Sequence, residues 1–260
     1  MKNVRTYGTA PYHIAVIHGG PGAPGEMAPV AREISLQCGV LEPLQTRTTL
    51  EGQLEELHTI VKEHGHLPIT LIGYSWGAML SFIFTAHHPL LVKKLILVSS
   101  GVFEDHYASS IMQTRLSRLS DEERARFDTL TTALHDPTNT DKNATFAHLG
   151  ELLSEADSYH PLPHPNEIVE CQYALYQSVW QDAQELRRSG ELLELGRTIL
   201  CPVVAIHGDY DPHPPAGIAI PLSRVVKDFR FILLPHCGHH PWYEKDAREH
   251  FYTLLKQEVP

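Results

Sequence analysis

The chain has 260 residues, 42% of them hydrophobic, and a formal net charge of −10. This length and apolar content suit one enzyme-sized domain with a large core, and the negative charge argues against nucleic acid or an anionic membrane as a partner. The four cysteines show neither metal-site nor disulfide spacing, and the N-terminal region holds no apolar run long enough for a signal peptide or a membrane span. We therefore expect a soluble, cytoplasmic protein.

The first expected core element is a short apolar strand over Tyr12–Ile17, which leads into the sequence HGGPG at residues 18–22. When an acyl carbon is attacked, its oxygen becomes negative, and fixed backbone N–H donors at that point lower the barrier. A glycine-rich loop directly after a strand can supply such a donor, and we expect it to be the N–H of Gly20. A plain glycine and proline turn is the alternative interpretation.

The most informative motif is GYSWG at residues 73–77, which puts Ser75 in a G-x-S-x-G frame. An apolar run predicts a buried strand over residues 68–72, directly before the motif. A serine hydroxyl is a weak nucleophile, so it must project from a tight strand-to-helix turn towards a base, and Gly73 and Gly77 leave room for that turn. The string alone also occurs in ordinary turns, so its partner motifs decide the interpretation.

Apolar residues at helical spacing predict a helix over Trp76–His87, which ends before Pro89. The backbone N–H of Trp76 would then lie at the helix N-terminus, where the helix dipole favours negative charge. We expect this N–H to be the second donor to the oxyanion, beside that of Gly20.

The segment of residues 104–195 is expected to be helical throughout, and it contains none of the candidate catalytic motifs. The predicted helices are one that starts in a capping box at Ser120 and ends at residues 136–137, one over residues 143–156, and a long one over residues 166–188. The segment follows a predicted strand at residues 94–99, so it would lie above the carboxyl ends of the parallel strands, where open α/β sheets bind ligands. We therefore expect a helical cap over residues 104–195, inserted in a core made of residues 1–103 and 196–260.

Two later strands, over residues 202–206 and Phe229–Leu234, each lead into a loop with charged or imidazole groups. The candidates in these loops are the carboxylates of Asp209 and Asp211 and the imidazoles of His236, His239 and His240. The chain order is then serine, acid and histidine, in which the histidine takes the proton from Ser75 and the acid orients the imidazole. The residues themselves leave the choice within each loop open.

The GYSWG motif, the Gly-x-x-Asp pattern of residues 208–211 and the Gly-His-x-Pro pattern of residues 238–241 resemble the α/β-hydrolase superfamily, over nearly the whole chain. The HGGPG and SWG strings are similar to those of the proline iminopeptidase branch, whose members remove an N-terminal residue from short peptides. The resemblance implies the α/β-hydrolase fold, a mostly parallel twisted sheet flanked by helices. It selects Asp211 as the acid and His239 as the base.

The chain departs from that branch after the oxyanion loop. Residues 39–49 lack the Asp-x-Arg-Gly-x-Gly-x-Ser segment that is usual there, and no position matches the acidic residues that hold a substrate's free amine. Only about a dozen residues precede the first core strand. The usual pair of leading antiparallel strands is therefore expected to be reduced to one.

We expect a serine hydrolase with a Ser-His-Asp triad, which cleaves a small ester or amide, including an N-terminal peptide residue, through an acyl-enzyme on Ser75 and without a cofactor. Two alternatives stay open: a carbon–carbon bond hydrolase or lyase that uses the same triad, and a non-catalytic small-molecule receptor on the same fold. The 18 histidines invite a metal hypothesis. The chain lacks a His-Glu-x-x-His helix, however, and the triad already explains the C-terminal cluster, so no metal is expected.

Overall fold

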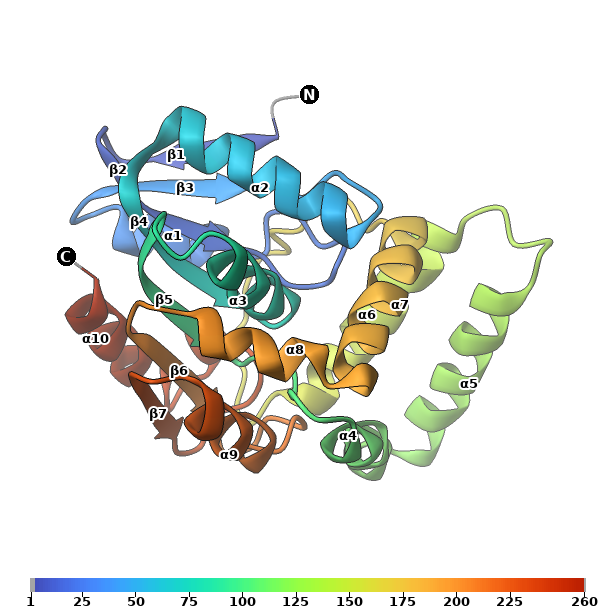
Figure 1. The fold of residues 1–260 in the computed structure, drawn as a ribbon. Helices are drawn as coiled ribbons and strands as arrows, with labels where there is room; N and C mark the ends of the chain where they lie inside the picture. Colours follow the sequence, from blue (N-terminus) through green and yellow to red (C-terminus); the bar gives the residue numbers. More distant parts are fainter. Residues whose placement is uncertain (1–2, 260) are drawn as a thin grey trace.

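The computed structural model describes residues 3–259, which form a seven-stranded sheet with helices on both faces (Figure 1). The strands in chain order are β1 (Val4–Tyr7), β2 (Tyr12–Ile17), β3 (Gly39–Pro43), β4 (Gly65–Tyr74), β5 (Val92–Val98), β6 (Val203–Gly208) and β7 (Phe229–Leu234). Their order in the sheet is β1-β3-β2-β4-β5-β6-β7. Among the described strands β1 alone is antiparallel to its neighbour, β3, so the expected single leading antiparallel strand is confirmed.

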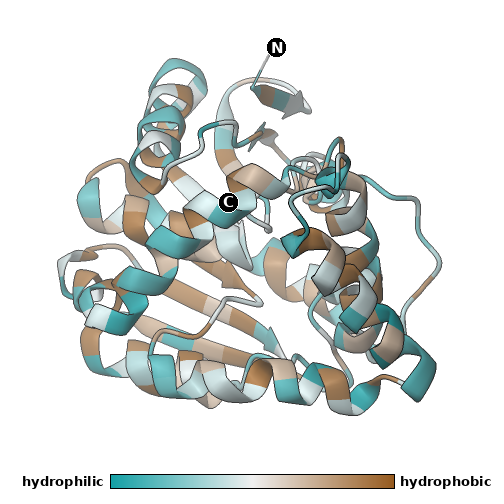
Figure 2. Cartoon of the chain, turned by 90° about the vertical axis from the view of Figure 1, so that its right-hand side faces the viewer, coloured by the Kyte–Doolittle hydropathy of each residue, from teal (hydrophilic) through white to brown (hydrophobic). Residues whose placement is uncertain are grey.

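The sheet is buried on both faces, because its central strands carry apolar residues at consecutive positions. In β5, for example, Ile96 and Val98 join one core cluster, whereas Leu95 and Leu97 join the other. The helices that cover the two faces are α1 (Ala28–Ile34) and α10 (Arg248–Glu258) on the first, and α2 (Leu50–His64), α3 (Trp76–His87) and α9 (Ala216–Val225) on the second. Figure 2 shows the resulting concentration of hydrophobic residues along the strands.

A helical segment separates β5 from β6. It contains α4 (Asp105–Arg118), α5 (Asp121–His135), α6 (Lys142–Asp157), α7 (Tyr173–Ser189), the short α8 (Glu191–Glu194) and the 3-10 turn η1 (Leu195–Thr198). Figure 1 shows α4 to α7 beyond the end of the sheet to which the strand arrows point. The predicted capping box is confirmed at the start of α5, where the N–H of Ser120 donates to the carboxylate of Glu123 at 2.7 Å and the Ser120 hydroxyl accepts in return.

The predicted long helix over residues 166–188 is wrong in its first part, because α7 begins only at Tyr173. Residues 161–172 form no helix, and their backbone hydrogen bonds go elsewhere. The N–H groups of Val169 and Gln172 donate to the carbonyls of Pro24 and Gly22, at 2.8 and 3.1 Å. This stretch is therefore held against the loop that follows β2.

The last described elements after β7 are the 3-10 turn η2 (Pro241–Tyr243) and α10. No helix in the described part of the chain is long and apolar enough to cross a membrane.

Candidate active site

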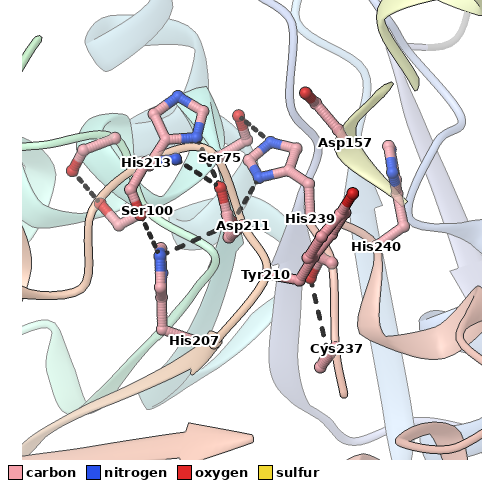
Figure 3. Close-up of polar contacts among 12 residues, drawn as sticks. Ser75, Ser100, Asp157, His207, Tyr210, Asp211, His213, Cys237, His239 and His240 are labelled. Carbon is pink, nitrogen blue, oxygen red and sulfur yellow. Dashed lines mark hydrogen bonds and ion pairs between the residues drawn. The ribbon is translucent and has the colours of Figure 1, made fainter. Parts of the chain in front are cut away.

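Three loops at the carboxyl edge of the sheet carry the candidate triad. Ser75 directly follows β4, Asp211 follows β6, and His239 follows β7. Because parallel strands end at the same edge, these loops meet although Ser75 and His239 are 164 positions apart. His239 Nε2 lies 3.1 Å from Ser75 Oγ, and His239 Nδ1 lies 2.7 Å from Asp211 Oδ2 (Figure 3). The three residues therefore form one continuous row of hydrogen bonds.

The serine sits on a sharp turn between β4 and α3. Its φ of 51° and ψ of −115° are unfavourable for a residue with a side chain, as expected where a turn must expose one hydroxyl. A Cβ on Gly73 would lie 2.3 Å from the carbonyl oxygen of Gly77, and a Cβ on Gly77 would lie 2.2 Å from the carbonyl oxygen of Ile17. Both glycines are therefore required by close backbone approach, which agrees with their interpretation from the sequence.

We expect Gly77→Ala to lower the free energy of unfolding by roughly 3 kcal/mol, because the new methyl group meets backbone that cannot move aside easily. The matched control is Gly150→Ala in α6, where a Cβ meets nothing within 4 Å. That change should stabilise the protein by about 0.5 to 1 kcal/mol. Urea denaturation of both variants checks these two expectations, and equal stabilities would contradict close backbone packing at the turn between β4 and α3.

Asp211 is the most constrained group of the site. Its Oδ1 accepts from the backbone N–H of His213 at 2.9 Å and from His213 Nδ1 at 2.8 Å, while Oδ2 faces His239. Burial by itself raises the pKa of Asp211, but the neighbouring imidazoles of His239, His207 and His213, together with the hydrogen bond from His213, hold that pKa well below its usual range. Asp211 is therefore an ionised carboxylate that only accepts hydrogen bonds.

The hydrogen bond to Asp211 fixes the tautomer of His239. Nδ1 carries the proton and donates to the carboxylate, which leaves the Nε2 lone pair to accept from the Ser75 hydroxyl. Burial lowers the pKa of His239, but the charge and hydrogen bond of Asp211 outweigh burial and raise that pKa above its usual value. The arrangement can therefore take a proton from Ser75 and stabilise the imidazolium that results.

His213 is a site residue that the sequence analysis missed, since nothing in its local sequence distinguishes it. Its ring stacks on that of His239, with centroids 4.8 Å apart and an interplanar angle of 27°. Burial lowers the pKa of His213 to about 4, so the ring is neutral near pH 7. It orients the carboxylate of Asp211 without adding a charge beside the base.

Among the described residues, Asp211, His213 and His239 also form the one group with enough ligand atoms close together to hold a metal ion. Their donor set would suit zinc. Both Nδ1 atoms, however, already lie 2.7 to 2.8 Å from the carboxylate oxygens. A metal ion bound through these nitrogens would therefore break their hydrogen bonds to Asp211.

The loop of residues 18–22 lies at the end of β2, where the oxyanion donor was expected. Gly20 has a φ of 104°, and a Cβ there would lie 2.7 Å from the N atom of Gly22, so the position requires glycine. His18 anchors the loop from within the core, because its Nδ1–H donates to the carbonyl of Gly19 at 2.8 Å and its Nε2 accepts from the N–H of Gln45 at 3.1 Å. The backbone of the loop is thereby fixed.

Trp76 is the first residue of α3, and the helix has no side-chain cap at Ser75, so the Trp76 N–H remains available as at other helix N-termini. The indole of Trp76 donates to the side-chain oxygens of Gln45 at 3.0 Å and Gln53 at 3.1 Å. The amide of Gln45 also donates to the carbonyl of His18 at 3.1 Å. Gln45, which the sequence analysis did not single out, therefore joins the two segments that carry the expected oxyanion donors.

The fold and this site define a class of protein, and comparison with known families agrees. The sequence model of the alpha/beta hydrolase fold matches residues 21–246, and the chain belongs to this family. The predicted superfamily and fold class are thus confirmed. A search of curated proteins by sequence finds no match.

Solved structures with similar folds include several hydrolases. VinJ superposes with a TM-score of 0.72 at 17% identity, covering 99% of this chain and 95% of VinJ. The proline iminopeptidase of Mycobacterium smegmatis has a TM-score of 0.61 at 18% identity, with 98% and 92% covered. The thioesterase domain of the curacin biosynthetic pathway has a TM-score of 0.60 at 17% identity, with 97% and 93% covered. At these identities the likeness concerns the fold, on which several hydrolytic activities occur.

Proposed function

We propose that this protein is a serine hydrolase that cleaves a small ester or amide, including the N-terminal residue of a short peptide, through an acyl-enzyme on Ser75. The observation that carries the proposal is the row of hydrogen bonds from Asp211 through His239 to Ser75, at 2.7 and 3.1 Å. A receptor that only binds its ligand would have no need for an aligned base and a strained serine turn. No cofactor takes part.

In the proposed mechanism, Ser75 Oγ attacks the acyl carbon while its proton moves to His239 Nε2. The Asp211 carboxylate stabilises the imidazolium, and the backbone N–H groups of Gly20 and Trp76 hold the oxyanion. His239 then donates its proton to the leaving group. A water oxygen then attacks the acyl carbon while its proton moves to the same nitrogen, and His239 returns that proton to Ser75 Oγ as the ester bond to Ser75 breaks and the acid leaves.

Substrate selection would belong to the helical cap, residues 104–195, and the chemistry to the core, residues 1–103 and 196–260. Two backbone contacts support this assignment, because they bring the cap next to the reacting residues. The carbonyl of Asp157 accepts from the N–H of His239 at 2.9 Å, and the N–H of Gln172 donates to the oxyanion loop at Gly22. The cap therefore adjoins both sides of the reacting centre.

The proposal is tested by treating the purified protein with a fluorophosphonate probe and locating the adduct by intact mass and peptide mapping. We expect one adduct on Ser75, because only an activated hydroxyl reacts with such probes at useful rates. If Ser75 is labelled, unlabelled protein from the same preparation is then assayed with a panel of aminoacyl amides and short-chain esters, which separates peptidase from esterase preference. Well-folded protein that binds these compounds but is neither labelled nor active would favour the receptor instead.

A further inference from the structure

Helix α4 carries two arginines, one helical turn apart, that reach towards the loops of the triad. Arg115 donates from Nε and Nη2 to both carboxylate oxygens of Asp157, at 2.6 to 3.1 Å. Arg118 donates to the carbonyls of Ala156 at 2.9 Å and Tyr210 at 2.8 Å, and its guanidinium lies 3.6 Å from the centroid of the Tyr210 ring. Residues three apart share one helix face, so both side chains act on the same side of α4.

Each arginine contacts a residue that is in turn joined to a member of the candidate triad. Asp157, held by Arg115, accepts the backbone N–H of His239 on its own carbonyl at 2.9 Å. Tyr210, held by Arg118, directly precedes Asp211, and its N–H donates to the carbonyl of Cys237 at 2.9 Å. Asp157 and Tyr210 both lie beside His239 in Figure 3.

A buried carboxylate closes the same region from the other side. Glu244 accepts from the N–H groups of Gly238, Tyr159 and His160, at 2.7 to 2.9 Å. A Cβ on Gly238 would lie 2.2 Å from the carbonyl oxygen of Asp157, so these two backbone segments are in direct contact. Any shift at the end of α6 is therefore passed to the loop that carries His239.

We propose that Arg115 and Arg118 are positioning residues, which use the end of α6 and the backbone of Tyr210 to set the distance between His239 and Ser75. The inference rests on the proposed function, because acylation of Ser75 is the reaction it governs. Arg115 is suited to the task since its side chain is 17% exposed and that of Asp157 4%, which makes the paired geometry rigid. The helical segment then contributes to the chemistry as well as covering the site.

The ion pair of Arg115 with Asp157 also affects the pKa of His239, the proposed base. The titratable and aromatic groups that face His239 are Asp211, His213, His240, Tyr74, Asp157 and Arg115. Among them the charge of Asp157 raises the pKa of His239 and that of Arg115 lowers it. Because the base must be neutral to act, the reaction rate falls as the pH drops through this pKa.

Removing Arg115 and removing the charge of Asp157 should therefore shift the acidic limb of the pH–rate profile in opposite directions. Arg115→Met removes a positive charge, so the pKa of His239 rises and the limb moves to higher pH. Asp157→Asn leaves Arg115 unpaired, so the pKa falls and the limb moves to lower pH. A change that merely loosens the fold would lower the rate without this opposition.

The experiment measures the second-order rate of fluorophosphonate labelling of Ser75 across pH, in the full chain. We expect Arg115→Met and Arg118→Met to lower the rate by about tenfold or more, because small misplacements of a base are costly. Arg126→Met, at an exposed arginine of α5, is the control and should stay within about twofold of the wild type. Arg115→Lys keeps the charge without the bidentate geometry and should fall in between.

Thermal denaturation shows which variants are folded, and Asp157→Asn and Arg115→Lys keep the test readable if the methionine variants unfold. If these folded variants show unchanged labelling rates and unshifted acidic limbs, the positioning role is overturned. Labelling of the wild type at Ser75 would still leave the serine mechanism intact. Lack of labelling in folded wild-type protein would instead refute the serine mechanism, and the positioning role with it.

Discussion

Ser75→Ala should lower kcat on the best substrate of the panel by about 10⁶-fold, because no other group can form the acyl-enzyme. The melting temperature should stay within a few degrees of the wild type. Alanine keeps the Cβ of serine, so it neither adds nor removes strain at a φ of 51°. Steady-state kinetics and thermal denaturation of the same preparation check both parts.

Two further serine variants give this prediction its controls. Ser223→Ala changes an exposed serine on α9 and should leave kcat unchanged. Ser75→Gly should be as inactive as Ser75→Ala but more stable, because glycine accepts the positive φ without cost. Full activity of Ser75→Ala would refute the mechanism.

Local sequence was sufficient for the elements whose apolar runs end at clear boundary residues. The strands β2 and β7 and the helix α3 have the predicted bounds. In each case glycine, proline or a polar loop begins where the apolar pattern stops. The turn at Ser75 was predictable for a related reason, although β4 (Gly65–Tyr74) is longer than the strand predicted over residues 68–72.

The choice of the candidate acid needed more than a local sequence pattern, because Asp209 and Asp211 lie in the same loop. The structure separates them by burial. Asp209 is exposed and accepts from the N–H of Cys237 at 3.2 Å, whereas Asp211 is buried beside His239. The family pattern favours the same residue that the hydrogen bonds favour.

The remaining features depend on contacts between distant parts of the chain. Residues 166–172 continue the apolar spacing of a helix, yet the N–H groups of Val169 and Gln172 donate to the loop after β2, which no local pattern could indicate. Gln45 and Arg115 are likewise ordinary in their own segments. Their importance comes from partners 27 and 42 positions away, His18 and Asp157.

Asp211→Asn should lower kcat by about 10⁴-fold, and the surroundings of the carboxylate explain why. Oδ1 accepts two hydrogen bonds from His213, so the amide of asparagine would place its oxygen there and turn its NH₂ group towards His239. Nδ1 of His239 must then accept, which puts the ring proton on Nε2. That nitrogen can no longer take the proton of Ser75.

The pH profile distinguishes this effect from a general loss of stability. In the wild type, activity should fall as the pH drops through the raised pKa of His239, because the imidazolium cannot act as a base. Removing the charge of Asp211 lowers that pKa, so the residual activity of Asp211→Asn should persist to lower pH. Asp209→Asn, two positions earlier and exposed, should match the wild type in both kcat and pH profile. If Asp209→Asn instead lost activity and Asp211→Asn kept it, the acid would be wrongly assigned even though the base and the nucleophile could stand.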